Sequence, residues 1–231
     1  MHRIDKVLSH ALNLSRSEIK KAIKEGWVIL NESLVKDAGT KVNEHDVIVF
    51  DKDIIKCFPD ELIMIHKPMG VVCSKTDPHY PSVFEVFNLS SKQYHMIGRL
   101  DQDTTGLLLL TTNGQLTHQL MSPNKKVNKH YFVTLNHDIT DEAVIQLESG
   151  VDIQDETPCA PAKVVVHEPR LIELIIHEGR YHQVKRMMQA LGYDVIKLHR
   201  SQVSFLTLDN LKLGEWRACR QEEIERLKQG N

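Results

Sequence analysis

Apolar residues recur at helical spacing in the first part of the chain and predict two short helices there. The apolar positions of residues 4–12 lie three and four apart, which predicts a first helix. Ser15 followed three residues later by Glu18 is a capping-box pattern that predicts the start of a second helix. Gly26 then predicts its end, as a left-handed residue. The inward face of this second helix would consist of Ile19, Ala22 and Ile23.

The pattern then changes to short strands. The segments WVIL and VNEHDVIVF, joined through the turn-like NES, are typical of strands. Residues 51–61 mix charges with a proline and keep no period, so we expect a linker there. This organisation predicts two domains, residues 1–58 and 59–231.

Beyond the linker, strand-like runs outnumber helical ones. LIMIHKP, YFVTL, AKVVV and RLIELII predict strands, and VIKLH predicts a further short strand. YHQVKRMMQALG predicts a helix that ends at Gly192, and RQEEIERLKQ predicts a terminal helix. The inward residues of the first of these helices would be Val184, Met187, Met188 and Leu191. Since strands and helices do not alternate strictly, the expected class is α+β. We expect a small α/β module followed by a larger domain with a mixed, mainly antiparallel sheet and flanking helices.

The composition is typical of a soluble globular protein. The 231 residues carry 29 Lys+Arg against 31 Asp+Glu, a net charge of −2, and 41% are hydrophobic. Apolar runs end at four residues, as in Leu107–Leu110, far below the ~20 that a membrane helix needs. The charged start MHRIDKVLSH predicts no export signal. Four scattered cysteines without a CxxC pair favour a reducing cytoplasm: Cys57, Cys73, Cys159 and Cys219.

Charge is distributed unevenly along the chain. Residues 1–41 hold 8 Lys+Arg against 5 Asp+Glu, a local excess of +3. Arg16, Lys20 and Lys24 recur every four residues and share one helix face, with Lys21 at its edge. This cationic face has two interpretations, a merely solvated helix surface or a stripe that follows RNA phosphates.

The segment GRLDQDTTGLLLLTTNG, residues 98–114, holds the most concentrated polar chemistry. A loop with Arg99, Asp101 and Asp103 leads directly into the apolar run, so either aspartate could be a helix cap or an Asx turn. A cation held by the two aspartates is the weaker alternative because no third acidic ligand lies nearby. Cys73 has no identifiable base partner, and neither GxxxxGK nor GxSxG occurs, which argues against P-loop and α/β-hydrolase chemistry.

The same segment resembles the central motif of pseudouridine synthases. Three further segments agree with that family in order and spacing: HKPMGVVCS, KHYFVTL and HEGRYHQVKRM. The stretch RIDKVL followed by SRSEIKKAIKEGWVILN resembles the small RNA-binding module named after ribosomal protein S-four. Together the chain resembles the ribosomal branch of the family, in which this module precedes a catalytic domain.

The resemblance implies an isomerisation of an RNA uridine, with no metal and no redox cofactor. It assigns the initiating carboxylate to Asp101 and the basic partner to Lys185, where many relatives carry arginine. Arg180 is a second candidate for that partner. Tyr131 would stack on the flipped base and could relay a proton.

Basic side chains gather around these motifs. Residues 177–200 hold five of them, Arg180, Lys185, Arg186, Lys197 and Arg200, against only Glu178 and Asp194, so we expect phosphate contacts there. His177 and His182 lack zinc-site spacing and are expected at the surface or facing RNA. The residues predicted to bind RNA are Arg16, Lys20, Lys21, Lys24, Arg99, Arg180 and Arg186.

The resemblance also suggests a substrate. Members that modify 23S rRNA often read EGKNRQVRRM, whereas this chain reads EGRYHQVKRM and lacks a long basic tail. We therefore expect a cytoplasmic, monomeric enzyme, not membrane-bound, whose partner is 16S rRNA or a small-subunit assembly intermediate. The alternatives are the same reaction on 23S rRNA, a non-catalytic RNA-binding or ribosome-assembly protein, and an RNA glycosidase that releases uracil.

Overall fold

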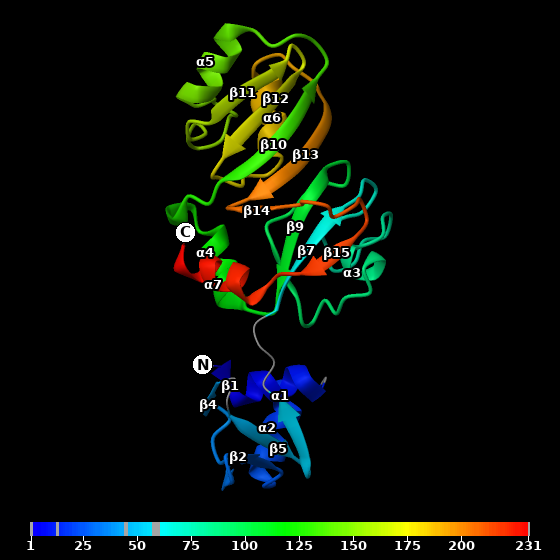
Figure 1. Cartoon of the computed structure of the whole chain (residues 1–231), viewed down its shortest axis with the longest axis vertical. Coiled ribbons are helices and arrows are strands. Elements are labelled where there is room, and N and C mark those ends of the chain that lie inside the picture. Colours follow the sequence, from blue (N-terminus) through cyan, green and yellow to red (C-terminus); the bar gives the residue numbers. More distant parts are fainter. Residues whose placement is uncertain (1, 13, 44–45, 57–60, 231) are drawn as a thin grey trace. The chain divides into compact units, whose positions relative to one another are not determined.

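The computed structural model describes residues 2–12, 14–43, 46–56 and 61–230. The chain divides into two compact units, Met1–Glu61 and Leu62–Asn231 (Figure 1). The predicted domain boundary between residues 58 and 59 lies outside the described residues. Among the helices that the structure describes, none combines the length and apolar character needed to span a membrane.

The amino-terminal unit packs two helices against short strands. The helices are α1 (Ile4–Leu12) and α2 (Arg16–Lys24), as the apolar spacing predicts. One sheet has the order β3-β2-β5-β6, and β1 pairs with β4 in a second. These strands are β1 (His2–Arg3), β2 (Val28–Leu30), β3 (Ser33–Leu34), β4 (Lys41–Val42), β5 (Val47–Phe50) and β6 (Asp53–Lys56). Their shared core contains Ile4, Leu8, Ile19, Ile23, Val28, Val35, Val42 and Ile48.

Helix α2 is fixed at both ends by local chemistry. The Glu18 backbone N–H donates to Ser15 Oγ at 3.2 Å, and the Ser15 N–H donates to Glu18 Oε2 at 2.7 Å, which confirms the capping box. Gly26 has φ +81° after the helix end, as predicted. Since Ile19 and Ile23 are buried, the rotation of the helix leaves Arg16, Lys20 and Lys24 exposed.

The predicted linker over residues 51–61 is wrong in its first part. Residues Asp53–Lys56 form β6, which pairs antiparallel with β5. Asp51 and Lys52 join the two strands and have φ values of 44° and 76°. Two successive left-handed residues match the twist of a tight hairpin, which lets the β-branched Ile54 and Ile55 pair. Residues 57–60 lie outside the described part.

The second unit is built on a nine-stranded sheet with the order β11-β12-β10-β13-β9-β7-β15, in which β14 also pairs with β13 and β8 with β9. The described pairs are antiparallel except β13 with β9, which gives the mixed, mainly antiparallel sheet expected. The strands are β7 (Leu62–Lys67), β8 (His95–Ile97), β9 (Thr105–Thr111), β10 (Lys129–Leu135), β11 (Lys163–Glu168), β12 (Leu171–Ile176), β13 (Val195–Val203), β14 (Leu206–Thr207) and β15 (Trp216–Ala218). The helices are α3 (Val83–Val86), α4 (Gly114–Met121), α5 (Asp141–Ser149), α6 (Gln183–Ala190) and α7 (Gln221–Gln229), with a short 3₁₀ turn at Pro123–Lys125.

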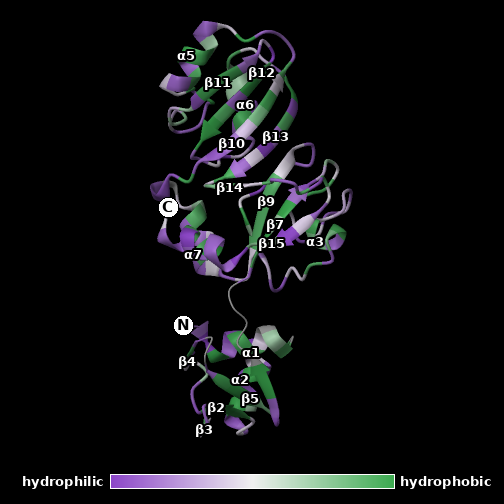
Figure 2. Cartoon of the chain, in the orientation of Figure 1, coloured by the Kyte–Doolittle hydropathy of each residue, from purple (hydrophilic) through white to green (hydrophobic). Residues whose placement is uncertain are grey.

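Strands β7 and β9 are buried on both faces, so apolar side chains run along them without alternation (Figure 2). Leu107 and Leu109 join a cluster with residues of α4 and α7. Leu108 and Leu110 face the opposite cluster, which includes residues of α3, α5 and α6. Burying each leucine contributes about 1.5–3 kcal/mol, so this four-residue run anchors the sheet centre directly after the polar loop.

Gly106 permits the one parallel contact of the sheet. Its φ is +116°, and it pairs with Arg200 across β9 and β13. A Cβ atom on Gly106 would lie 2.2 Å from the Arg200 carbonyl oxygen and 2.6 Å from its nitrogen. Only glycine allows this approach, which places Arg200 beside the polar loop that precedes β9.

We therefore expect Gly106→Ala to lower the free energy of unfolding by about 3 kcal/mol or more, because the methyl group forces β9 from β13. Gly114→Ala is the matched control, since no atom lies within 4 Å of its added Cβ and its φ is not positive. That control should change stability by less than about 1 kcal/mol. Urea denaturation measures both, and equal stability of the two variants would contradict this account of Gly106.

Candidate active site

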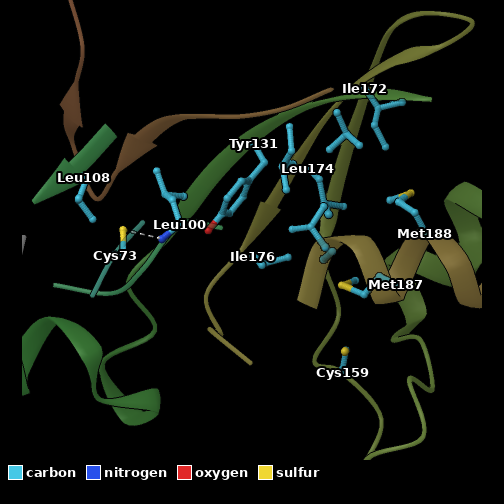
Figure 3. Close-up of a cluster of buried hydrophobic side chains, with 14 of the residues drawn as sticks. Cys73, Leu100, Leu108, Tyr131, Cys159, Ile172, Leu174, Ile176, Met187 and Met188 are labelled. Atoms are coloured by element: carbon cyan, nitrogen blue, oxygen red, sulfur yellow. Dashed lines mark hydrogen bonds between the residues drawn. The ribbon is translucent and has the colours of Figure 1, made fainter. Parts of the chain in front are cut away.

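The polar loop between β8 and β9, residues 98–104 and named here the Asp101 loop, is held from several sides. The Gly70 backbone N–H donates to the Gln102 carbonyl at 2.9 Å, and the Leu100 N–H points to Cys73 Sγ at 3.4 Å. Leu100 itself is buried in the core cluster; Figure 3 shows its contact with Cys73. These anchors on both sides of position 101 fix its backbone.

Lys67 holds the last residue of the same loop, Thr104, through a hydrogen bond. Its side chain is fully buried, and its Nζ donates to the carbonyls of Pro68 and Thr104, both at 2.9 Å. Burial lowers the pKa of Lys67, while the nearby Cys73 thiol and Asp101 act in the opposite direction. Lys67 forms no ion pair with a described carboxylate, so its positive charge adds to the field at the loop.

The Asp101 carboxylate contacts two basic side chains from the start of α6. Lys185 Nζ lies 3.4 Å from Oδ2, and His182 Nε2 lies 3.3 Å from Oδ1. The Asp101 side chain is 27% exposed, so it is accessible yet largely shielded from water. No described hydrogen bond makes the Asp101 side chain a helix cap, which disfavours the capping interpretation for this residue.

Asp103 shares the same lysine. Lys185 Nζ lies 2.5 Å from Asp103 Oδ1, closer than it lies to Asp101. Partial burial raises the pKa of Asp103, but the hydrogen bond and charge of Lys185 outweigh this and leave the pKa lowered. Because Asp103 is half exposed, water screens this pair more than the Asp101 pair. Within the described residues, no three His, Cys, Asp or Glu side chains are grouped to hold a metal ion.

Arg180 does not approach Asp101. Its guanidinium donates to the carbonyls of Thr157 and Pro158 and pairs with Glu178 at 3.0 Å. Arg186 is similarly engaged by Asp155 at 2.6 Å and by the Ile153 carbonyl. The structure thus brings Lys185, not Arg180, to the carboxylate. Arg180 and Arg186, two of the four arginines predicted to bind RNA, are therefore occupied by contacts within the protein.

The turn before α6, residues 177–182 and named here the His182 turn, differs from the predicted helix start. Helix α6 begins at Gln183 rather than Tyr181, because His182 has φ 47° and ψ 34° in the left-handed region. That conformation costs about 1–3 kcal/mol for a residue other than glycine and turns the His182 ring toward Asp101. The inward helix residues Val184, Met187 and Met188 are buried as predicted, whereas Leu191 is only partly buried. Gly192 follows the helix with φ +84°.

Tyr131 lies on β10 between the core and the cavity. The residue is 8% exposed and packs in the same cluster as Leu100. Figure 3 shows the phenol oxygen of Tyr131 on the side of Leu100. Arg200 Nη1 lies 3.4 Å from the Tyr131 hydroxyl and donates to it. Tyr131 is therefore a mostly buried aromatic that also lines the cavity, which combines the two interpretations of this residue.

Arg200 is buried, in contrast to the phosphate contact predicted for it. It is 2% exposed, and its Nε donates to the Leu107 carbonyl at 2.7 Å. Its Nη2 is buried without a hydrogen-bond partner among the described residues. Sequence reasoning grouped Arg200 with the surface cations because its inward position on β13 is set by pairing with Gly106 and Tyr131.

Lys129 is a further, partly buried cation that sequence reasoning missed. Its Nζ donates to the carbonyls of Val127, His177 and Glu178 at 3.2–3.4 Å and so ties β10 to the His182 turn. Burial, followed by repulsion from Arg200, lowers the pKa of Lys129 to about 8. Like Lys67 and Arg200, it forms no ion pair with a described carboxylate. Lys129 and Arg200 line the site itself, whereas Lys67 lies behind the Asp101 loop, where it holds the Thr104 carbonyl.

These residues surround one cavity of about 1360 Å³, lined by the Asp101 loop, Tyr131, Lys129, Arg200 and the His182 turn. Arg99 also lines it and is exposed. Cys73 lines it as a buried thiol whose pKa burial raises, so it is a poor nucleophile.

In the amino-terminal unit, Arg16, Lys20, Lys21 and Lys24 are exposed on α2, and Lys21 pairs loosely with Glu25 at 3.8 Å.

A largely shielded carboxylate beside a lysine, in a large cavity, is typical of an enzyme active site. The family model described as RNA pseudouridylate synthase matches residues 61–190, and the S4 domain model matches residues 2–48. The chain belongs to the RNA pseudouridylate synthase family and is an isomerase that acts on RNA.

Relatives that match the chain over nearly its full length agree with this family assignment. The chain is 38% identical over 229 residues to a protein of Haemophilus influenzae named ribosomal small subunit pseudouridine synthase A, covering 97% of this chain and 99% of that protein. It is also 38% identical to the protein of that name from Escherichia coli, over 96% of this chain and 98% of the relative. A solved structure titled as a pseudouridylate synthase is 35% identical with a TM-score of 0.69, over 98% of this chain and 100% of that one.

Proposed function

We propose that this enzyme converts a uridine of 16S ribosomal RNA to pseudouridine and that Asp101 initiates the reaction. The observation that carries the proposal is the Asp101 carboxylate in the cavity, 3.4 Å from Lys185. The small-subunit substrate is supported by the names of relatives that match the chain over nearly its full length. The substrate could be free RNA or RNA in a partly assembled subunit.

In the proposed reaction the N1–C1′ glycosidic bond breaks, the uracil turns, and a C5–C1′ bond forms; C5 loses a proton and N1, no longer bonded to C1′, gains one. Atoms and electrons balance within the nucleotide, so the chemistry requires no external oxidant or reductant. Asp101 could attack C1′, attack the ring or promote elimination, and each route begins with its ionised carboxylate. Lys185 would maintain that charge in a cavity that excludes much of the water.

Tyr131 would hold the flipped uracil. Its ring is fixed by the core, and its hydroxyl is held by Arg200, so little side-chain freedom remains to be lost on binding. Stacking of the base on this ring would offset part of the cost of extruding a uridine from folded RNA.

RNA outside the cavity would be held by exposed cations. The role is supported for Arg99 by its exposure at the cavity, and for Arg16, Lys20, Lys21 and Lys24 by their exposure on α2 of the amino-terminal unit. The match to the S4 domain supports the second assignment.

Three described cysteines are buried free thiols, which supports a cytoplasmic location for the enzyme: Cys73, Cys159 and Cys219.

We predict that Asp101→Asn lowers the rate of pseudouridine formation by at least about a thousandfold, because the amide keeps the shape but carries no charge. RNA affinity should stay within about threefold of wild type. Asp103→Asn is the control and should stay within about tenfold in rate, since Asp103 is half exposed. Pseudouridine is mapped in a 16S transcript and in a partly assembled small subunit. Near-normal turnover by folded Asp101→Asn would refute the site assignment, and unmodified RNA with wild-type protein would refute the substrate.

The cationic face of α2 gives a second prediction. Reversing both Lys20 and Lys24 to Glu should weaken RNA binding and flatten its salt dependence, by about 0.7–0.9 in log–log slope per lost phosphate contact. The control reverses Lys36 and Lys52, exposed lysines of the same unit that lie off this helix. Binding is measured across a salt series. Identical slopes for the two double variants would show that the α2 face does not contact phosphates.

A further inference from the structure

Tyr181 is a large aromatic side chain left in water at the edge of the active-site cavity. It is 68% exposed and lines the same cavity as Asp101. One side of its ring stacks on His182, with centroids 3.9 Å apart and planes 16° from parallel. Its hydroxyl has no hydrogen-bond partner among the described residues, so nothing in the fold accounts for a tyrosine here.

The stacked pair is held rigidly next to the reacting group. His182 adopts the left-handed conformation, and its Nε2 lies 3.3 Å from Asp101 Oδ1. Glu178 braces the turn, because its carboxylate accepts from the Ala160 N–H at 3.1 Å and from Gln183 Nε2 at 2.8 Å. The Tyr181 ring is therefore presented in one orientation, one stacking step outward from the ring that touches Asp101.

The surroundings favour a base over a phosphate as the ligand of this ring. The two neighbouring arginines, Arg180 and Arg186, are engaged by Glu178 and Asp155 and leave no fork of donors beside Tyr181. An exposed aromatic face instead binds nucleobases by stacking, with little dependence on which base it meets.

We propose that Tyr181 stacks on the nucleobase immediately adjacent to the target uridine. This inference rests on the proposed function only in that an RNA uridine enters this cavity. When that uridine turns in toward Asp101, its neighbour stays at the cavity mouth and loses a stacking partner. The open side of the Tyr181 ring replaces that partner, so Tyr181 stabilises the extruded state and positions the substrate without touching the reacting atoms.

The kinetic test compares Tyr181→Leu, Tyr181→Phe and the control Trp216→Leu, which removes an exposed aromatic of the same unit that does not line the cavity. Tyr181→Leu should raise KM for the RNA about tenfold or more, with a much smaller change in kcat. Tyr181→Phe should restore the wild-type KM, since only the ring is needed, and Trp216→Leu should not change it. An unchanged KM in folded Tyr181→Leu overturns the inference.

A double-mutant cycle identifies the contact. Once wild-type protein has located the modified uridine, oligoribonucleotides are made with an abasic site on its 5′ or 3′ side. For wild-type protein, one of these abasic RNAs should bind about tenfold less tightly than intact RNA. For Tyr181→Leu, the same abasic RNA should bind as tightly as intact RNA does. Additive losses on both sides overturn the inference. Product formation with additive losses would leave the proposed function standing and remove only the stacking role.

A fluorescence experiment decides the matter even if 16S RNA is not the substrate. A heptamer of uridylates with one central 2-aminopurine riboside is titrated with full-length protein. Stacking on Tyr181 should quench the probe with wild type and Trp216→Leu but not with Tyr181→Leu. Equal quenching by all three proteins contradicts the proposal.

Discussion

The contact between Asp101 and Lys185 is the interaction around which the catalytic unit is organised. The two side chains come from a loop before β9 and from helix α6, and they meet at 3.4 Å. Their approach needs the β9–β13 contact at Gly106 and the anchoring of the loop by Lys67 and Cys73. Lys185 thus places a positive charge beside one carboxylate oxygen of Asp101, and His182 Nε2 lies 3.3 Å from the other.

Three further cations lie near this pair, Lys129 and Arg200 in the cavity wall and Lys67 behind the Asp101 loop, and none forms a carboxylate ion pair in the described structure. Lys67 and Lys129 donate to backbone carbonyls, and Arg200 donates through Nε to the Leu107 carbonyl and through Nη1 to the Tyr131 hydroxyl. Carbonyl dipoles satisfy the donors but do not cancel their charge, so the field of the cations reaches the cavity. Such an arrangement suits a polyanion that must bring its base, and the phosphates next to it, to a single carboxylate.

Local chemistry in the sequence predicted much of this architecture. The Ser15–Glu18 box, the apolar spacing of α1 and the strand-like runs of the sheet each depend on neighbouring residues and were confirmed. The hairpin at Asp51 and Lys52 escaped because lysine at the second turn position is not typical of left-handed turns, where glycine is expected. The burial of Arg200 and the left-handed His182 escaped because tertiary contacts, rather than neighbouring residues, determine them. Motif resemblance placed Asp101 and Lys185 together, whereas the residues alone favoured a cap or Asx turn, with a cation site as the weaker alternative.

The most direct test of this account is the single-turnover rate of pseudouridine formation in Lys185→Met and Lys185→Arg at saturating RNA. Methionine keeps the length of the side chain but removes its charge, whereas arginine keeps the charge. The account predicts that Lys185→Met reacts at least about a hundredfold more slowly and that Lys185→Arg stays within about tenfold of wild type. A wild-type rate in Lys185→Met, with the protein folded and RNA bound, would contradict the central role of the charge beside Asp101.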